Sequence, residues 1–161
     1  MRLFRRPAAE FLHRGRPLGG DVDWEGCVWP EGEKADRRRI LAALRAVVEP
    51  DPKDWSDPQT MVQVAVGNPH RGSLYPAAVP MTDLLLLIAR EYPGRPRAVA
   101  LDVLEDWWGL FEVEPKSEAG VIPAIVERIT AARPFLESIP DAGDLLEEMT
   151  RDWTGEAPPS S

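Results

Sequence analysis

Cysteine and histidine are nearly absent from this sequence. One cysteine, Cys27, and two histidines, His13 and His70, occur among 161 residues. A single thiol cannot close a disulfide within the chain, and two histidines so far apart lack the spacing of a zinc site. We therefore expect no internal disulfide and no metal site. Cys27 is interpreted as a small buried residue, because no basic neighbour in the sequence favours its thiolate.

The sequence also lacks phosphate-binding glycine motifs and long apolar runs. Neither GxGxxG nor the P-loop pattern occurs, so we expect no nucleotide cofactor. The longest apolar run, residues 84–89, is far too short to cross a bilayer. Residues 1–16 contain arginines but no apolar stretch of signal-peptide length, which favours a cytoplasmic protein.

Basic residues are fewer than acidic residues in this chain. The chain has 19 Lys and Arg against 27 Asp and Glu, a formal charge of −8. This balance argues against a nucleic-acid partner or an anionic membrane, since both require a basic surface. The first 20 residues carry five arginines and one glutamate, so the rest of the chain has a net charge of −12. Residues 101–118 are the most acidic stretch, with six acidic residues and one lysine.

Helical periodicity dominates the chain after its first 35 residues. Apolar residues recur at three- and four-residue spacing, and no segment alternates convincingly as a strand. We predict an all-α domain of six or seven helices over residues 36–153, followed by a disordered tail over residues 154–161. Pro80 is expected to bend or restart a buried helix over residues 76–90.

Residues 1–35 follow neither the helical nor the strand period for long. They combine arginine, glycine and proline with four bulky aromatic residues, which are Phe4, Phe11, Trp24 and Trp29. We interpret this segment as an irregular arm with a short helix near residues 7–13. Two readings of the arm stay open: its aromatics clamp it to the body, or it is a frayed terminus.

The clearest amphipathic helix begins after Gly94 and carries two adjacent tryptophans, Trp107 and Trp108. Adjacent residues lie about 100° apart around a helix, so both indoles cannot point into the same core, and one interpretation places one indole in the core and the other partly exposed. The alternative is that both pack against neighbouring helices. An exposed tryptophan rimmed by carboxylates would suit a basic protein partner. The candidate partner-binding residues are Asp102, Glu105, Asp106, Trp108, Glu112 and Glu114.

Catalytic groups are harder to find. Asp102, Glu105 and Asp106 share one helical face, but that face lies opposite the apolar stripe and should be solvated, with ordinary pKa values. His70, Arg71 and Tyr75 form a possible secondary polar site in a turn, where an exposed histidine without a role is the simpler interpretation. No pattern in the sequence pairs these groups, so an enzyme is the last-ranked hypothesis.

One stretch of the chain carries a family resemblance. Ala78-Val79-Pro80 and Val121-Ile122-Pro123 repeat at a 43-residue interval, within the roughly 40–47 residues of HEAT repeats. A proline in a first helix, a leucine run, a short turn and then Arg97 before an apolar second helix resemble one HEAT unit. The preceding Gly67-Asn68 and Gly72-Ser73-Leu74-Tyr75 are similar to a segment of small HEAT-like proteins from high-GC bacteria. The resemblance covers about residues 57–111.

This resemblance implies a stack of antiparallel helix pairs that binds another protein. A recurrent role of small HEAT-like proteins is immunity to a bacterial toxin. Our specific hypothesis is therefore an immunity-type inhibitor that masks a basic toxin domain through the acidic residues and Trp108. The alternatives are an adaptor or regulatory subunit of an endogenous bacterial complex and, last, a helical enzyme. The partner's identity and the oligomeric state stay open.

Overall fold

Capping residues and prolines set where the helices begin. The computed structural model describes residues 11–27, 35–49, 57–109 and 120–150. Asp36 caps the first helix by accepting a hydrogen bond from the backbone N–H of Arg39 at 3.2 Å. Asp57 caps the second helix, accepting from the N–H of Thr60 at 3.1 Å, and Pro58 occupies its first position.

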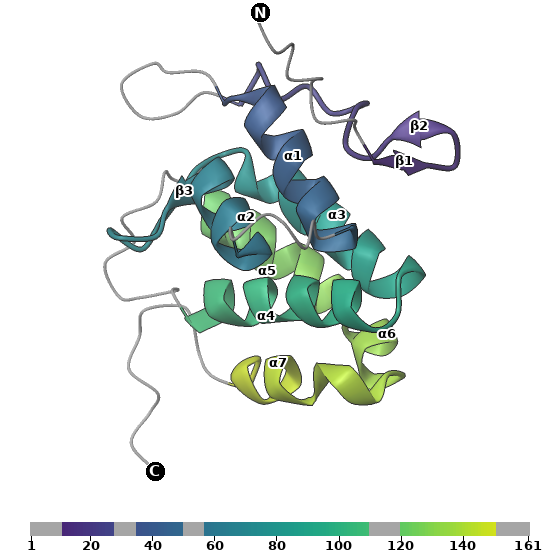
Figure 1. Cartoon of the computed structure of the whole chain (residues 1–161). Helices are drawn as coiled ribbons and strands as arrows, with labels where there is room; N and C mark the ends of the chain where they lie inside the picture. The colour runs from purple at the N-terminus through teal and green to yellow at the C-terminus, as the bar shows by residue number, and fades with distance from the viewer. Residues whose placement is uncertain (1–10, 28–34, 50–56, 110–119, 151–161) are drawn as a thin grey trace, which may run out of the picture.

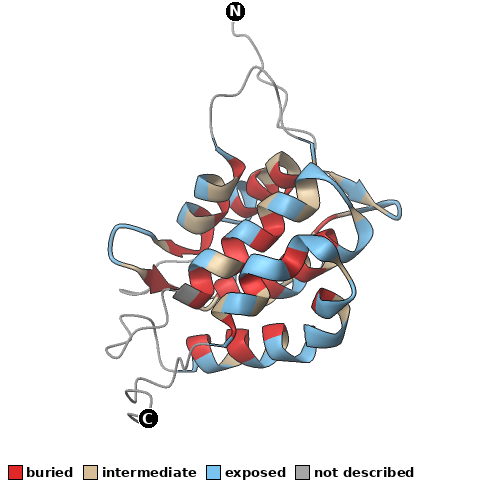
Figure 2. Ribbon diagram, turned by 90° about the horizontal axis from the view of Figure 1, so that it is seen from below, coloured by how far each residue is buried: buried red, intermediate tan, exposed pale blue. Residues whose placement is uncertain are grey.

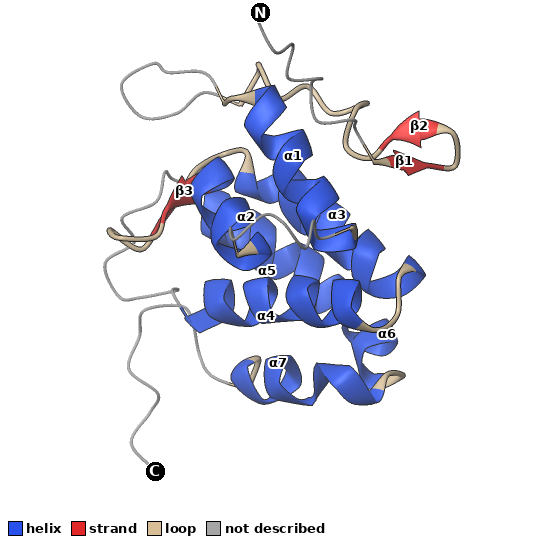
Figure 3. Cartoon of the chain, in the orientation of Figure 1, coloured by secondary structure: helices blue, strands red, loops and turns tan. Residues whose placement is uncertain are grey.

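The described residues form seven α-helices and one short 3-10 helix, with two small strand pairs (Figure 3). In chain order the helical elements are α1 (Arg37–Val48), α2 (Pro58–Val66), α3 (Ala78–Glu91), α4 (Arg95–Gly109), α5 (Val121–Ala131), α6 (Arg133–Glu137), η2 (Pro140–Ala142) and α7 (Gly143–Glu148). Strand β1 (Leu12–His13) pairs antiparallel with β2 (Arg16–Pro17), and β3 (Gly67–Asn68) pairs antiparallel with β4 (Ser73–Leu74). The all-α prediction is confirmed, while the HEAT-type repeat stays a prediction.

Two local predictions were wrong. Pro80 lies in the first turn of α3, where its missing N–H has no helical partner to lose, so it neither bends nor restarts the helix. Residues 12 and 13 of the arm form a strand instead of the end of a short helix, and residues 7–10 of that predicted helix lie outside the described residues. The hairpin forms because Arg14 and Gly15 both adopt positive φ, at 51° and 78°, which closes a two-residue turn.

Helix α4 lies at the centre of the packing. It contacts α3, α2 and α1 on one side and α7 on the other (Figure 1). A helix covered on two sides buries residues around much of its circumference, so Trp107 and Trp108 are both buried. Of the two interpretations of the tryptophan pair, the one in which both pack against neighbouring helices is confirmed, and the one with a partly exposed tryptophan is wrong.

The arm belongs to the same core as the helices (Figure 2). Leu18 is 5% exposed and Trp24 only 1% exposed. The indole N–H of Trp24 donates to the Gly19 carbonyl at 2.8 Å, which satisfies its polar atom inside the protein. The described part of the arm agrees with the interpretation in which its aromatic residues clamp it to the body. Phe4 and Trp29 lie outside the described residues.

Candidate functional site

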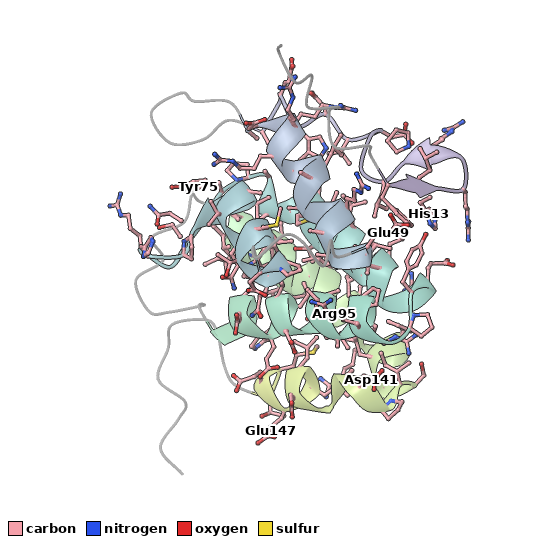
Figure 4. All side chains as sticks on the ribbon, in the orientation of Figure 1. His13, Glu49, Tyr75, Arg95, Asp141 and Glu147 are labelled. Atoms are coloured by element: carbon pink, nitrogen blue, oxygen red, sulfur yellow. The ribbon has the colours of Figure 1, made fainter. Side chains whose placement is uncertain are left out.

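Carboxylates gather at the end of the molecule formed by α4 and α7. Asp102, Glu105 and Asp106 project from α4, and α7 packs against this helix with its own acidic residues. Asp57, the cap of α2, completes the group. We call this set the acidic surface; its members are Asp57, Asp102, Glu105, Asp106, Asp144 and Glu148. Figure 4 marks its end of the molecule by Glu147 on α7.

The carboxylates of the acidic surface perturb one another. Partial burial raises the pKa of Asp102 above its ordinary value, and the charges of Asp106, Asp144 and Asp57 raise it further. Burial also raises the pKa of Glu105, followed by the charges of Asp144, Asp102, Glu148 and Asp106. The expectation of ordinary pKa values for these two groups was wrong, because packing partly buries both carboxylates and α7 adds a second set of negative charges against α4.

Positive charge does not neutralise the middle of this surface. Asp102, Glu105 and Asp144 form no ion pair and no hydrogen bond with any residue that the structure describes. Like charges held together without a counter-charge oppose folding, so this arrangement leaves an attractive site for a cation or a basic surface. The described residues contain no group of three or more histidine, cysteine, aspartate or glutamate side chains arranged to hold a metal ion.

Asp106 differs from the other two α4 carboxylates because it is held by α2. The side-chain amides of Gln59 and Gln63 both donate to its Oδ2, the latter at 2.9 Å. Two amide donors and an exposed carboxylate form a bridge between α2 and α4. Asp106 therefore contributes its charge to the acidic surface while its position is fixed within the fold.

The other predicted partner-binding residues do not reach this surface as expected. Trp108 is 5% exposed, so it offers a partner almost no area and cannot be the anchor of an interface. Glu112 and Glu114 lie outside the described residues. The site is accordingly a surface of carboxylates from several helices, without a central tryptophan.

The secondary polar site lies elsewhere, on the β3–β4 hairpin. His70 and Arg71 are exposed at its tip, and Tyr75, labelled in Figure 4, is half-buried at its base. Gly67 allows the two strands to approach, since a Cβ atom there would lie 2.4 Å from the Ser73 carbonyl oxygen. Gly67 is therefore required for the pairing of β3 with β4.

Sequence reasoning missed the acidic residues of α7 and the cap of α2. A signal was present, since residues 141–148 hold four acidic residues and no basic residue. Periodicity alone could not place them, because the packing of α7 on α4 joins segments about forty residues apart. Cys27 is half-buried, so its interpretation as a buried residue holds only in part. Burial and the charge of Asp23 raise the pKa of its thiol, which disfavours the nucleophilic thiolate.

Neither the protein-family models, nor the curated proteins, nor the solved structures contain a match to this chain. In the part of the chain that the structure describes, every helix is too short or too polar to span a membrane.

Proposed function

We propose that this chain is a protein-binding module whose acidic surface recognises a basic partner. The observation that carries the proposal is the convergence of carboxylates from α2, α4 and α7, three of which lack a counter-charge among the described residues. Their shared negative potential would attract a basic surface over a long range and increase the rate of encounter.

The same surface makes a specific prediction about how the partner is held. Large apolar side chains are scarce on the described exterior, where Leu12 and Val64 are the exposed examples. Charge therefore has to contribute more to recognition of the partner than the burial of an aromatic side chain does. Binding of this kind weakens as salt screens the charges, over a Debye length of about 8 Å at physiological ionic strength.

The finer proposal is an immunity-type inhibitor that masks a basic toxin domain. A nuclease toxin needs a basic surface to hold its nucleic acid substrate. A rigid array of carboxylates would compete for that surface by presenting negative charges of its own. The resemblance to small HEAT-like proteins, some of which act in toxin immunity, supports this step by analogy alone.

Charge reversal tests the role of the acidic surface. The Asp102→Lys/Glu105→Lys variant should slow association with the partner by roughly tenfold or more at low salt and reduce the salt dependence. Glu25→Lys/Glu127→Lys changes the total charge equally at two exposed positions outside the acidic surface, and serves as the matched control. Equal effects of both variants in stopped-flow or surface-binding kinetics would remove this surface from the interface.

Co-expression tests the immunity proposal itself. The product of an adjacent toxin-like gene is expressed with and without this chain, and growth and complex formation on size exclusion are measured. Protection from growth arrest together with a complex is the expected result. A pull-down from the native host that recovers an endogenous assembly, without any protection, would favour the adaptor role instead.

A further inference from the structure

A hollow lies between residues of the β1–β2 hairpin and helix α3. Figure 1 shows this hairpin at the other end of the molecule from α7. It holds about 400 Å³ and is partly open to solvent. Small-molecule sites in proteins typically span roughly 300–1,000 Å³. The hollow is thus large enough for a small organic ligand, and it shares no residue with the acidic surface.

The walls of the hollow are fixed by contacts on both sides. His13 is hydrogen-bonded through Nδ1 to the Tyr92 hydroxyl, and Arg14 pairs with Glu91 at 3.2 Å. The Phe11 ring meets the Tyr92 ring edge to face, with centroids 5.6 Å apart. Because the His13 hydrogen bond and the Phe11 ring contact tie the hairpin to Tyr92 at the end of α3, the cavity exists before any ligand arrives.

Gly19 brings the arm close to the helices beside the hollow. A Cβ atom at this position would lie 2.8 Å from a Leu44 methyl and 3.1 Å from a Leu84 methyl. Its φ of +78° is also a conformation that favours glycine. The backbone at Gly19 therefore lies directly against α1 and α3, and both Gly19 and Leu84 line the hollow.

The lining divides into an apolar floor and a cationic rim. Leu84 and Leu87 of α3 provide half-buried apolar surface, and Leu18, Val22 and Pro17 extend it. His13, Arg14 and Arg16 lie at the rim. The acidic lining residue, Asp21, is 3.7 Å from Arg16, and both side chains are more than three-quarters exposed.

The rim arginines have donors left for a ligand. A guanidinium has five N–H donors, and a single carboxylate partner engages at most two of them in the paired geometry. Exposed ion pairs such as Arg16 with Asp21 contribute little, so a ligand carboxylate can displace or join them. Arg14 adopts a positive φ, which is uncommon for a residue other than glycine and fixes where its side chain leaves the turn.

We propose that this hollow binds a small amphipathic carboxylate. Its head group is held by Arg14 and Arg16 on the hairpin, and its hydrocarbon part lies on Leu84 and Leu87 of α3. The apolar floor selects against small hydrophilic anions, and the cationic rim selects against neutral or cationic ligands of the same length. This site is independent of the proposed protein-binding role.

A series of straight-chain carboxylates tests the proposal on the full chain. Acetate, butanoate, hexanoate, octanoate and octanamide are titrated by calorimetry and by NMR of the leucine methyl groups. Octanoate should bind with a Kd of about 1 mM or tighter and shift the Leu84 and Leu87 methyl signals. Each methylene removed should weaken binding by up to roughly fourfold, and octanamide should bind at least about tenfold more weakly than octanoate.

Variants separate the two halves of the site. Arg14→Asn/Arg16→Gln should weaken octanoate binding by roughly tenfold or more, since asparagine accepts positive φ and preserves the turn. Leu87→Trp should abolish binding by filling the hollow while leaving both arginines. Arg38→Gln/Arg133→Gln removes the same charge from two exposed positions outside the lining and should leave binding unchanged. Circular dichroism and the Tm check that each variant folds.

Three results would overturn the proposal. If octanoate does not bind at millimolar concentration, the hollow is not a site for this class of ligand. Affinity that does not depend on chain length means that the arginines attract any anion. If octanamide binds as tightly as octanoate, or if the Arg14→Asn/Arg16→Gln variant binds octanoate as tightly as the parent chain, the apolar floor alone holds the hydrocarbon and the arginines have no role.

Discussion

Arg97 connects three segments through one side chain. Its Nε–H donates to the Ala89 carbonyl near the end of α3 at 2.6 Å, and its guanidinium is 3.7 Å from Asp141 in η2. Its side chain is 15% exposed. A cation at a helix C-terminus satisfies a carbonyl that lacks a helical partner and interacts favourably with the helix dipole. Arg97, which also fits the HEAT-like pattern, therefore has a direct structural function.

Arg97→Met should lower the free energy of unfolding by about 1–3 kcal/mol, because it leaves the Ala89 carbonyl without its donor while keeping much of the apolar volume. Chemical denaturation measures the change. Arg133→Met removes an exposed pair with Glu137 within one helix and should cost less than about 0.5 kcal/mol. An Arg97 variant as stable as the Arg133 variant would contradict the assigned role.

At the scale of elements, the arm is a part of the fold with little regular structure of its own. Its two strands are two residues each, so hydrogen bonds between them cannot hold it in place. Burial of Leu18 and Trp24, together with the contacts of His13 and Arg14 to the end of α3, holds it instead. The arm therefore depends on side chains far away in the sequence.

Trp24→Ala should destabilise the protein by about 3–5 kcal/mol, because it removes a fully buried indole and leaves a cavity. Urea denaturation gives the free energy, and limited trypsin digestion should cut after Arg14 sooner than in the parent chain; the bond after Arg16 precedes Pro17 and is not a trypsin site. Leu12→Ala, at a side chain that is 60% exposed, should change both measurements little. Unchanged digestion in the Trp24 variant would mean that the arm is held without this residue.

The carboxylates of the acidic surface make the stability of the whole molecule depend on pH. Asp102 and Glu105 have raised pKa values, so the folded state binds protons more readily at these positions than the unfolded chain does. Their contribution to stability is therefore greatest below their ordinary pKa values of 3.8 and 4.5 and is lost as pH rises through the raised values.

Asp102→Asn/Glu105→Gln should raise the Tm at pH 7 by about 1–2 °C, since it relieves repulsion that solvent already screens in part. The gain should shrink at high salt and disappear at a pH below 3.8, where both parent carboxyls are protonated. Thermal melts over pH and salt measure this. Asp83→Asn breaks a 3.1 Å pair with Arg128 and should not raise the Tm; a variant of the acidic surface that melts below the parent at pH 7 would refute the repulsion.

Sequence predicted what depends on neighbours along the chain. The helical periods, the proline starts and the acidic face of α4 follow from residues within a few turns of one another, and the all-α class is confirmed. The burial of Trp108 and the raised pKa of Asp102 depend on α7 and α2 packing against α4, which no local pattern specifies. The hollow beside Leu87 was likewise missed, because its rim comes from a hairpin more than sixty residues earlier.

The contacts between the arm and α3 join residues that are synthesised at different times. His13 and Tyr92 are separated by 79 positions, so the arm leaves the ribosome long before the helix that receives it. At about 5–20 residues per second, this delay is roughly 4–16 seconds. During that interval His13 and Arg14 lack their partners on α3, Tyr92 and Glu91, so these contacts form only after α3 has been synthesised.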